Sequence, residues 1–166
     1  ILSVGQIIKE GSRQIHLDFH TSGLIENIGE NFSKEQFKKA LKIGNVNSIN
    51  IFGKGHHGYS YYNTKIGTRH PHLKFDLLKE QIEACHEMGV TAQVYFTVGW
   101  SQKDADDHPE WILKDKNGTT NKLEVLKKLG PNDRLPNFTW RLLAPSNGYD
   151  EFILKQVEEI CVNYNI

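Results

Sequence analysis

Polar and aromatic side chains gather at the ends of three apolar, strand-like segments of the chain. In segment 14–20, apolar residues alternate with His16, Asp18 and His20, and a period of two places these three on one face of a strand. Segment 46–52 runs into the glycine-rich stretch 53–59, and segment 90–98 is followed by Gly99. The three ends carry Asp18, His20, Lys54, His56, His57, Tyr59, Tyr95, Thr97 and Trp100.

These residue types favour a neutral, polyhydroxylated ligand. Charged and bidentate groups hydrogen-bond sugar hydroxyls, and the apolar C–H face of a sugar packs on an aromatic ring. Lys54 stands between two glycines at a strand end and is expected to reach inward. Neighbouring side chains of an extended strand point in opposite directions, so only one of His56 and His57 is expected to face the ligand. The predicted substrate-binding residues are His20, Lys54, His56, His57, Tyr59 and Trp100.

A metal centre is the alternative chemistry. His16, Asp18 and His20 on one strand face, with His56 and His57 nearby, offer ligand types that zinc accepts. The pattern lacks a paired-cysteine motif, so the prediction assigns no metal ligand. A nucleophilic serine is not indicated, because the Gly-x-Ser-x-Gly turn is missing.

Helices are expected between the strand-like segments. Ser33 and Gln36 have capping-box spacing, Phe32 and Phe37 have the spacing of a hydrophobic staple, and Gly44 is expected to end that first helix. A second helix is expected to begin after Asp76 and end at Gly89, and a third begins near Asp150. The apolar stripe of this third helix is expected to consist of Ile153, Val157, Ile160, Cys161 and Tyr164.

Alternating strands and helices predict an α/β fold with parallel strands and helical crossovers. Long, functional loops after strands and short turns before them are typical of a (β/α)8 barrel or a doubly wound sheet. Because neither a GxGxxG turn nor a P-loop follows a strand, the barrel is favoured. A barrel needs about 250 residues. The 166 residues are therefore expected to form one partial domain, the N-terminal portion of a barrel ending before strand four, with an insertion at about 101–148. A small three-stranded α/β domain is the alternative.

The composition restricts the kinds of partner that the chain is expected to bind. The chain has 20 basic and 20 acidic side chains, whereas binding to nucleic acid or a membrane surface favours a basic excess. No apolar run reaches the ~20 residues that span a bilayer. Cys85 and Cys161 lie in helical patterns and are expected to be buried, reduced thiols, which slightly favours a cytoplasmic location. The sequence does not indicate an oligomeric state.

Several motifs, in order, resemble a glycoside-hydrolase-like barrel family, hypothetical glycosyl hydrolase family 6. The resemblance covers roughly residues 12–115. It rests on His16-Leu17-Asp18-Phe19-His20-Thr21-Ser22, Lys54-Gly55-His56-His57-Gly58-Tyr59-Ser60-Tyr61-Tyr62, His70-Pro71-His72-Leu73, Phe75-Asp76-Leu77-Leu78, Glu83-Ala84-Cys85-His86, Tyr95-Phe96-Thr97-Val98-Gly99-Trp100 and His108-Pro109-Glu110-Trp111. A more distant likeness runs to the α-L-fucosidases, whose motif Lys-His-His-Asp-Gly-Phe is matched at Lys54, His56 and Gly58 and is altered at Gly55, His57 and Tyr59.

The resemblance implies a retaining or inverting glycosidase that works with two carboxylates and no cofactor. It implies a sugar-binding role for His56 and places the nucleophile at the end of strand four, beyond Ile166, with Asp18 the best-placed carboxylate in this chain. The complete protein is expected to hydrolyse an O-glycosyl bond of a carbohydrate substrate, and this chain alone is expected to be inactive. Two alternatives stay open: a metal-dependent hydrolase and a non-catalytic sugar-binding protein.

Overall fold

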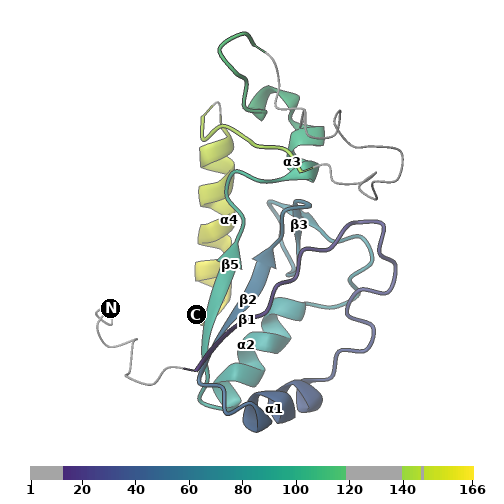
Figure 1. The fold of residues 1–166 in the computed structure, drawn as a ribbon, viewed down its shortest axis with the longest axis vertical. Helices are drawn as coiled ribbons and strands as arrows, with labels where there is room; N and C mark the ends of the chain where they lie inside the picture. The colour runs from purple at the N-terminus through teal and green to yellow at the C-terminus, as the bar shows by residue number, and fades with distance from the viewer. Residues whose placement is uncertain (1–12, 119–139, 147) are drawn as a thin grey trace, which may run out of the picture.

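Three parallel strands form the centre of a five-stranded sheet, which is completed by two short strands of the loop after the middle strand (Figure 1). The computed structural model describes residues 13–118, 140–146 and 148–166. The strands β1 (Gln14–His16) and β5 (Thr91–Phe96) both pair in parallel with β2 (Ser48–Lys54), which lies between them. The predicted parallel pairing is confirmed, although β1 ends at His16 rather than at residue 20, and β2 extends two residues further than predicted.

Helices cover one face of this sheet. The helices are α1 (Lys34–Ile43), α2 (Leu77–Glu87) and α4 (Tyr149–Asn163). Ile49 and Ile51 of β2 pack against apolar side chains from all three, so the main core lies between the sheet and the helices. The opposite face carries Phe52 and Tyr95, whose rings stack at 4.2 Å, and this is the face toward which His16 and His20 point.

The expected helix boundaries of α1 and α2 are confirmed. Ser33 accepts a hydrogen bond from the backbone N–H of Gln36, and the rings of Phe32 and Phe37 lie 5.9 Å apart. The side chain of Asp76 caps α2 by accepting from the backbone N–H of Lys79 at 2.9 Å. Such caps satisfy N–H groups that have no partner inside the helix. Local spacing therefore predicted these two elements correctly.

The apolar stripe predicted for α4 is partly wrong. Ile153 and Ile160 are buried as expected, but Cys161 is exposed. Two polar residues of α4, Gln156 and Glu159, are buried instead. Glu159 accepts hydrogen bonds from Thr64 and Lys65 at 2.6 Å each, so α4 binds the loop after β2 through polar contacts that hydrophobic spacing does not reveal. The expectation of a buried thiol holds for Cys85 alone.

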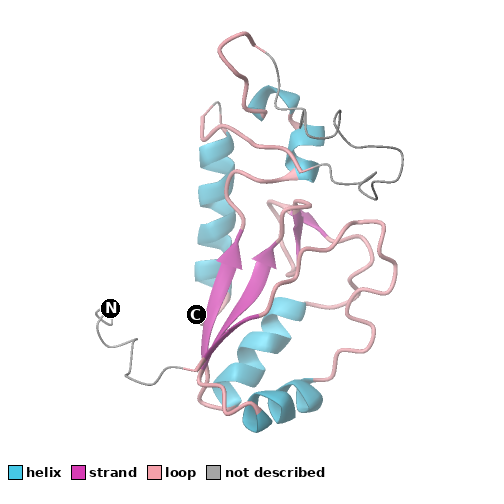
Figure 2. Cartoon of the chain, viewed as in Figure 1, coloured by secondary structure: helices cyan, strands magenta, loops and turns pink. Residues whose placement is uncertain are grey.

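Most of the long loops lie at the carboxyl ends of the strands (Figure 2). The loop after β2 contains two short strands, β3 (Tyr59–Ser60) and β4 (Thr68–Arg69). The predicted insertion contains the short helix α3 (Gln102–Asp107), which was not predicted, and a 3-10 turn at Pro109–Trp111. Within the described residues, none of the helices has the length and apolarity that crossing a bilayer requires.

Candidate functional site

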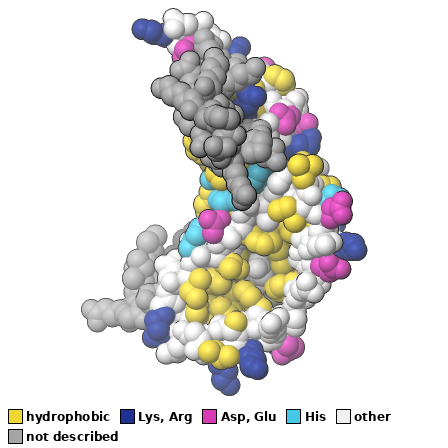
Figure 3. Space-filling model, turned by 45° about the vertical axis from the view of Figure 1, so that its right-hand side comes forward, with side chains coloured by type: hydrophobic (Ala, Val, Ile, Leu, Met, Phe, Trp, Pro, Cys, Tyr) yellow, Lys and Arg dark blue, Asp and Glu magenta, His cyan; other side chains and the backbone are white. Residues whose placement is uncertain are grey.

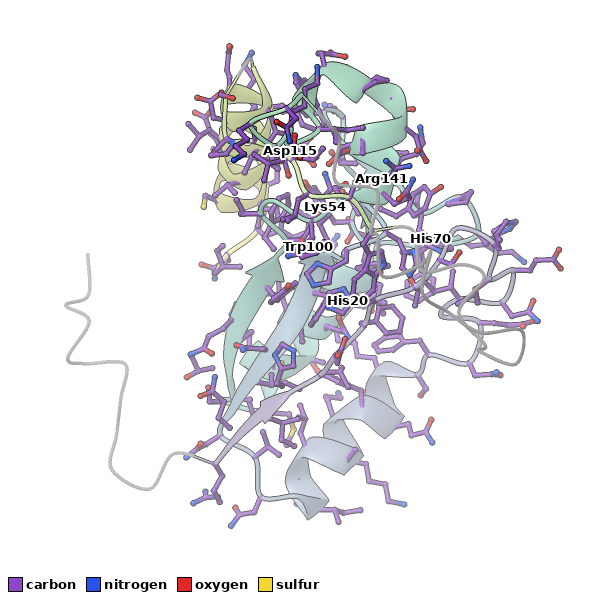
Figure 4. The ribbon with its side chains drawn as sticks, turned by 45° about the horizontal axis from the view of Figure 1, so that its top comes forward. His20, Lys54, His70, Trp100, Asp115 and Arg141 are labelled. Carbon is purple, nitrogen blue, oxygen red and sulfur yellow. The ribbon has the colours of Figure 1, made fainter. Side chains whose placement is uncertain are left out.

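Two histidines from different loops stack at the end of the sheet. The imidazole rings of His20 and His56 lie 3.9 Å apart with an interplanar angle of 18°. The edge of His20 meets the rings of Phe52 and Tyr95, at centroid distances of 4.9 and 5.7 Å. In Figure 4 the labelled His20 and Trp100 both lie toward the carboxyl ends of the strands. The predicted convergence of the first two strand ends is therefore present in the fold.

Two glycines allow this close approach. A Cβ atom at position 55 would come within 2.8 Å of Tyr61 Oη and 3.2 Å of His20 Nδ1, so only glycine leaves room for the ring of His20. Gly58 has a positive φ of 85°, and a side chain there would overlap Ser101. The spacing Gly-His-His-Gly is thus a requirement of backbone geometry at this site.

The hydrogen bonds of His56 fix its tautomer. The hydroxyl of Thr97 donates to the carbonyl of Trp100 at 2.8 Å, which uses its only proton. The same oxygen lies 2.7 Å from Nδ1 of His56, so it accepts a hydrogen bond from an Nδ1–H group. In a neutral ring this leaves Nε2 unprotonated. His56 therefore presents Nε2 as a hydrogen-bond acceptor.

His20 has the opposite tautomer. The backbone N–H of His56 donates to Nδ1 of His20 at 2.9 Å, so that nitrogen carries no proton. In the neutral ring the proton is then on Nε2, which lies 3.5 Å from Oδ1 of the largely exposed Asp18. At that length the contact with Asp18 is weak, and Nε2–H stays available to a ligand. The stacked pair thus offers one donor and one acceptor.

Burial keeps both rings neutral. The pKa of His56 is lowered to about 4, mainly by desolvation and also by the neighbouring His20 and His57, against the opposing effect of Asp18. Desolvation also lowers the pKa of His20, with Asp18 again opposing it. The pKa of His57 is lowered too, mainly by burial. At neutral pH the cluster is therefore a set of uncharged donors and acceptors, which suits a neutral ligand.

Tryptophan rings border the histidines. The ring of Trp140 lies 4.6 Å from that of His56 and 5.5 Å from those of both His20 and His57, and Trp100 lies 6.3 Å from His56. Hydrogen bonds between segments 99–101 and 141–143, including Leu143 N–H to the carbonyl of Gly99 at 2.7 Å, hold this second tryptophan-bearing segment in place. The sequence prediction included Trp100 and missed Trp140. The available signal was an aromatic residue in an insertion after a strand, where ligand contacts concentrate.

Lys54 does not reach this site. Its side chain is 0% exposed, and its Nζ lies 2.6 Å from Oδ2 of Asp104, which is 2% exposed, and 3.2 Å from Oε1 of Gln156. The pairing of β2 with β5 shifts register between Phe52 and Lys54, and such a bulge redirects the following side chain. The structure therefore places Lys54 between β2, α3 and α4, and not beside His56.

Tyr59 and His57 lie to one side of the stacked pair. The ring of Tyr59 packs against His70 at 5.3 Å, and no ring contact joins it to His20 or His56 within the described residues. His57 touches the cluster through Trp140 and lines a neighbouring cleft together with Tyr59. Of the six predicted substrate-binding residues, the structure thus brings together His20, His56 and Trp100, with His57 at the margin.

The described residues contain no group of three or more histidine, cysteine or acidic side chains that could hold a metal ion. Nδ1 of His16 lies 3.3 Å from the amide nitrogen of Asn50, and Nδ1 of His20 accepts from the backbone. Trp111 is buried and stacks on His108 at 3.7 Å. These contacts give the histidines hydrogen-bonding and packing roles.

Solved structures similar to this chain include several fucosidases. The α-L-fucosidase isoenzyme 2 of Paenibacillus thiaminolyticus shares 39% identity at a TM-score of 0.80, with 92% of this chain and 22% of that chain covered. An α-fucosidase of Thermotoga maritima, in complex with a mechanism-based inhibitor, shares 18% identity at a TM-score of 0.55, covering 82% of this chain and 27% of that one. The chain thus spans about a quarter of the length of these enzymes, and the second likeness shows the fold alone.

A maltogenic α-amylase, AmyB of Thermotoga neapolitana, has a TM-score of 0.56 at 15% identity, with 92% of this chain and 37% of that chain covered. None of the curated proteins matches the chain. The sequence model of the family described as "Hypothetical glycosyl hydrolase 6" matches residues 33–166, which include the Gly-His-His-Gly stretch and the third strand end. The chain therefore belongs to the hypothetical glycosyl hydrolase 6 family, as its motifs indicated.

Proposed function

We propose that this chain supplies part of the sugar-binding site of a glycoside hydrolase, and that a terminal α-L-fucosyl residue is its substrate. One observation carries the proposal: the stacked pair of His20 and His56 presents a fixed donor beside a fixed acceptor. Neighbouring hydroxyls of a sugar offer both functions, and a neutral pair receives them without burying charge. Family membership supports hydrolysis as the reaction, and the 39% identity to a fucosidase supports the sugar.

The aromatic surroundings fit the same ligand. Phe52 and Tyr95 form an apolar base under His20, and Trp100 and Trp140 stand beside His56. Fucose has a methyl group at C5 and an apolar C–H face, both of which pack on partly exposed rings such as those of Tyr95, Trp100 and Trp140. The binding contribution of this chain is therefore a combination of two imidazole hydrogen bonds and aromatic packing.

The bond-breaking carboxylates are proposed to come from elsewhere in the complete protein. Hydrolysis of a glycoside uses two carboxyl groups, about 5 to 5.5 Å apart in retaining enzymes. Among the described residues, Asp18 is the carboxylate near the stacked pair, and Asp104 is sequestered by Lys54. One carboxylate near the pair does not supply both groups, so we expect residues 1–166 alone to be inactive.

We further propose that the sheet is the first part of a (β/α)8 barrel. The face of the sheet away from α1, α2 and α4 carries Asn50, Phe52 and Tyr95, a mixture of polar and aromatic groups that suits a barrel interior opening onto a site. The loop-bearing ends of the strands hold the histidines, as active sites of such barrels do.

The test is hydrolysis of 4-nitrophenyl α-L-fucoside by the full-length protein. Replacing His56 by alanine removes one hydrogen bond and part of the packing, so kcat/KM is expected to fall about 10- to 100-fold. His86 is an exposed histidine of α2, and His86→Ala is the matched control that should retain wild-type kcat/KM. Sugar binding without turnover would favour the non-catalytic alternative. Equal activity of His56→Ala and wild type would contradict the assigned site.

A further inference from the structure

A second hollow lies beside the stacked histidines. It is a cleft of about 380 Å³ between the loop 22–24 and α3, and it is lined also by His57 and Tyr59. This volume is at the lower end of the range of small-molecule sites, about 300 to 1,000 Å³. The cleft and the stacked pair share a boundary, because Trp140 lies against the rings of both His56 and His57.

The loop that forms one wall is held by buried groups. The ring of His70, which is almost fully buried, donates from Nε2 to the carbonyl of Ser22 at 2.9 Å, since its Nδ1 accepts from the backbone N–H of His72. Thr21, the residue before Ser22, places its backbone N–H 3.1 Å and its hydroxyl 2.8 Å from the hydroxyl of the buried Tyr61. This wall is therefore fixed without a ligand.

The opposite wall, α3, is also anchored. Its residue Asp104 forms the buried ion pair with Lys54, and the backbone N–H groups of Gln102 and Lys103 donate to the carbonyls of His56 and His57 at 3.1 Å each. A ligand entering the cleft thus meets two preformed walls, and it is spared the cost of ordering them.

The lining groups favour a neutral, hydroxylated ligand. Lys103 is paired with Asp107, so the described lining offers no free cation for an anionic ligand. Asp106 accepts a hydrogen bond from the Gln102 amide at 2.6 Å and has a second oxygen available, and the Ser22 hydroxyl still has a proton to donate. Tyr59 and Leu24, which is 79% exposed, add apolar surface to this polar set.

We propose that this cleft binds a second sugar residue, the one attached to the sugar held by His20 and His56. The inference rests on the proposed function, because it takes the stacked pair as the site of the terminal residue. It assigns the two neighbouring histidines to different subsites: His56 contacts the terminal sugar, and His57 contacts the next one. Specificity for the glycan beyond the scissile bond then resides in loop 22–24 and α3.

The experiment compares two kinds of substrate with the full-length protein. α-L-Fucosyl fluoride occupies the first subsite alone, whereas α-(1→2)-, α-(1→3)- and α-(1→4)-linked fucosyl disaccharides also carry a second sugar. Asp106→Ala and Leu24→Ala alter exposed residues of the two walls, and Glu110→Ala removes an exposed carboxylate of the same insertion that does not line the cleft. We expect Asp106→Ala to lower kcat/KM about tenfold on at least one disaccharide, through the loss of a charge-assisted hydrogen bond.

Leu24→Ala should also lower kcat/KM on the disaccharides. For both variants, kcat/KM for the fluoride should stay within about twofold of wild type. Glu110→Ala should leave kcat/KM unchanged for the fluoride and for the disaccharides. The inference is wrong if both wall variants leave kcat/KM for all three disaccharides unchanged. It is also wrong if they lower kcat/KM for the fluoride as much as for the disaccharides. In those cases hydrolysis of the fluoride by the wild type still supports the proposed function. A wild type that hydrolyses neither substrate overturns the proposed function, and the cleft assignment with it.

Discussion

At the scale of single residues, the site depends on which imidazole nitrogen carries a proton. Thr97 decides this for His56, because its hydroxyl donates to the carbonyl of Trp100 and can only accept from the ring. The backbone N–H of His56 decides it for His20. Because one ring donates a hydrogen bond and the other accepts one, the pair selects for the donor or acceptor role of each hydroxyl group as well as for its position.

Thr97→Val keeps the shape of the buried side chain and removes its oxygen. The Nδ1–H of His56 then has no acceptor, the other tautomer becomes accessible, and affinity for L-fucose is expected to fall about tenfold. Isothermal titration with the full-length protein measures this, and Thr97→Ser, which keeps the hydroxyl, should bind close to wild type. An unchanged dissociation constant for Thr97→Val would show that the tautomer does not matter.

The titration of His56 is a second residue-scale prediction. Burial favours the uncharged form of a base, so its pKa lies at about 4, below the ordinary value of 6.5. NMR of the full-length protein labelled in histidine, with the signal assigned by His56→Gln, should give a midpoint near that value. Between the two pH values the unfolded chain binds more protons than the folded one, so acid also lowers stability over this range. A midpoint near 6.5 would contradict a partly buried ring that is held neutral by desolvation.

At the scale of elements, the bulge at the end of β2 gives Lys54 a structural role and leaves the proposed sugar binding to the histidines of the following loop. It turns Lys54 toward α3 and α4, where the ammonium group meets Asp104 and Gln156. The side chain also lies over the rings of Phe96 and Phe152, at 5.7 and 5.2 Å from their centroids. Burial lowers the pKa of this lysine and Asp104 opposes that shift. The pair ties the histidine-bearing loop to the two helices that border it.

Removing one partner of this pair leaves a buried, uncompensated charge. Lys54→Met is therefore expected to lower the free energy of unfolding by about 3 to 5 kcal/mol. Lys155, which pairs with Glu151 on the surface of α4, provides the control, and Lys155→Met should cost less than about 1 kcal/mol. Urea denaturation of the full-length protein gives both values. Equal losses for the two variants would mean that the buried pair has no special structural role.

Sequence patterns predicted those elements whose signals are local. The caps at Ser33 and Asp76 set the starts of two helices, and alternation placed His16 and His20 on one face of the sheet. The direction of Lys54 was not predictable, because a register shift between two strands redirects it. Trp140 is held near the site by β-bridges that join Trp100 to Leu142 and Ile112 to Leu143, and a short-range sequence pattern does not predict such distant pairings.

At the scale of the whole molecule, the sheet has unpaired edges and exposed apolar side chains within the part of the chain that the structure describes. Ile15 of β1, in register with Ile49, is 42% exposed, and Leu17 is 36% exposed. Figure 3 shows apolar side chains gathered over the lower half of one face, with histidine side chains near their upper margin. A barrel would cover the outward side of β1 with a further helix and the free edge of β5 with a further strand.

Hydrogen exchange tests the proposed barrel. Thr91 and Thr97 donate their N–H groups toward the β2 side, so strand alternation directs those of Ala92, Val94 and Phe96 to the free edge of β5. In the full-length protein these three amides are expected to be protected, because a following parallel strand accepts from them. Exchange of the three at the rate of exposed amides would rule out a fourth strand at this edge.

The most direct test of the central claim is a crystal structure of the full-length protein with L-fucose bound. Hydroxyl oxygens of one fucose molecule are predicted to lie within about 3.2 Å of Nε2 of His20 and of Nε2 of His56, which are the free donor and the free acceptor of the stacked pair. A fucose bound elsewhere, or one whose hydroxyls touch neither ring nitrogen, would contradict the account.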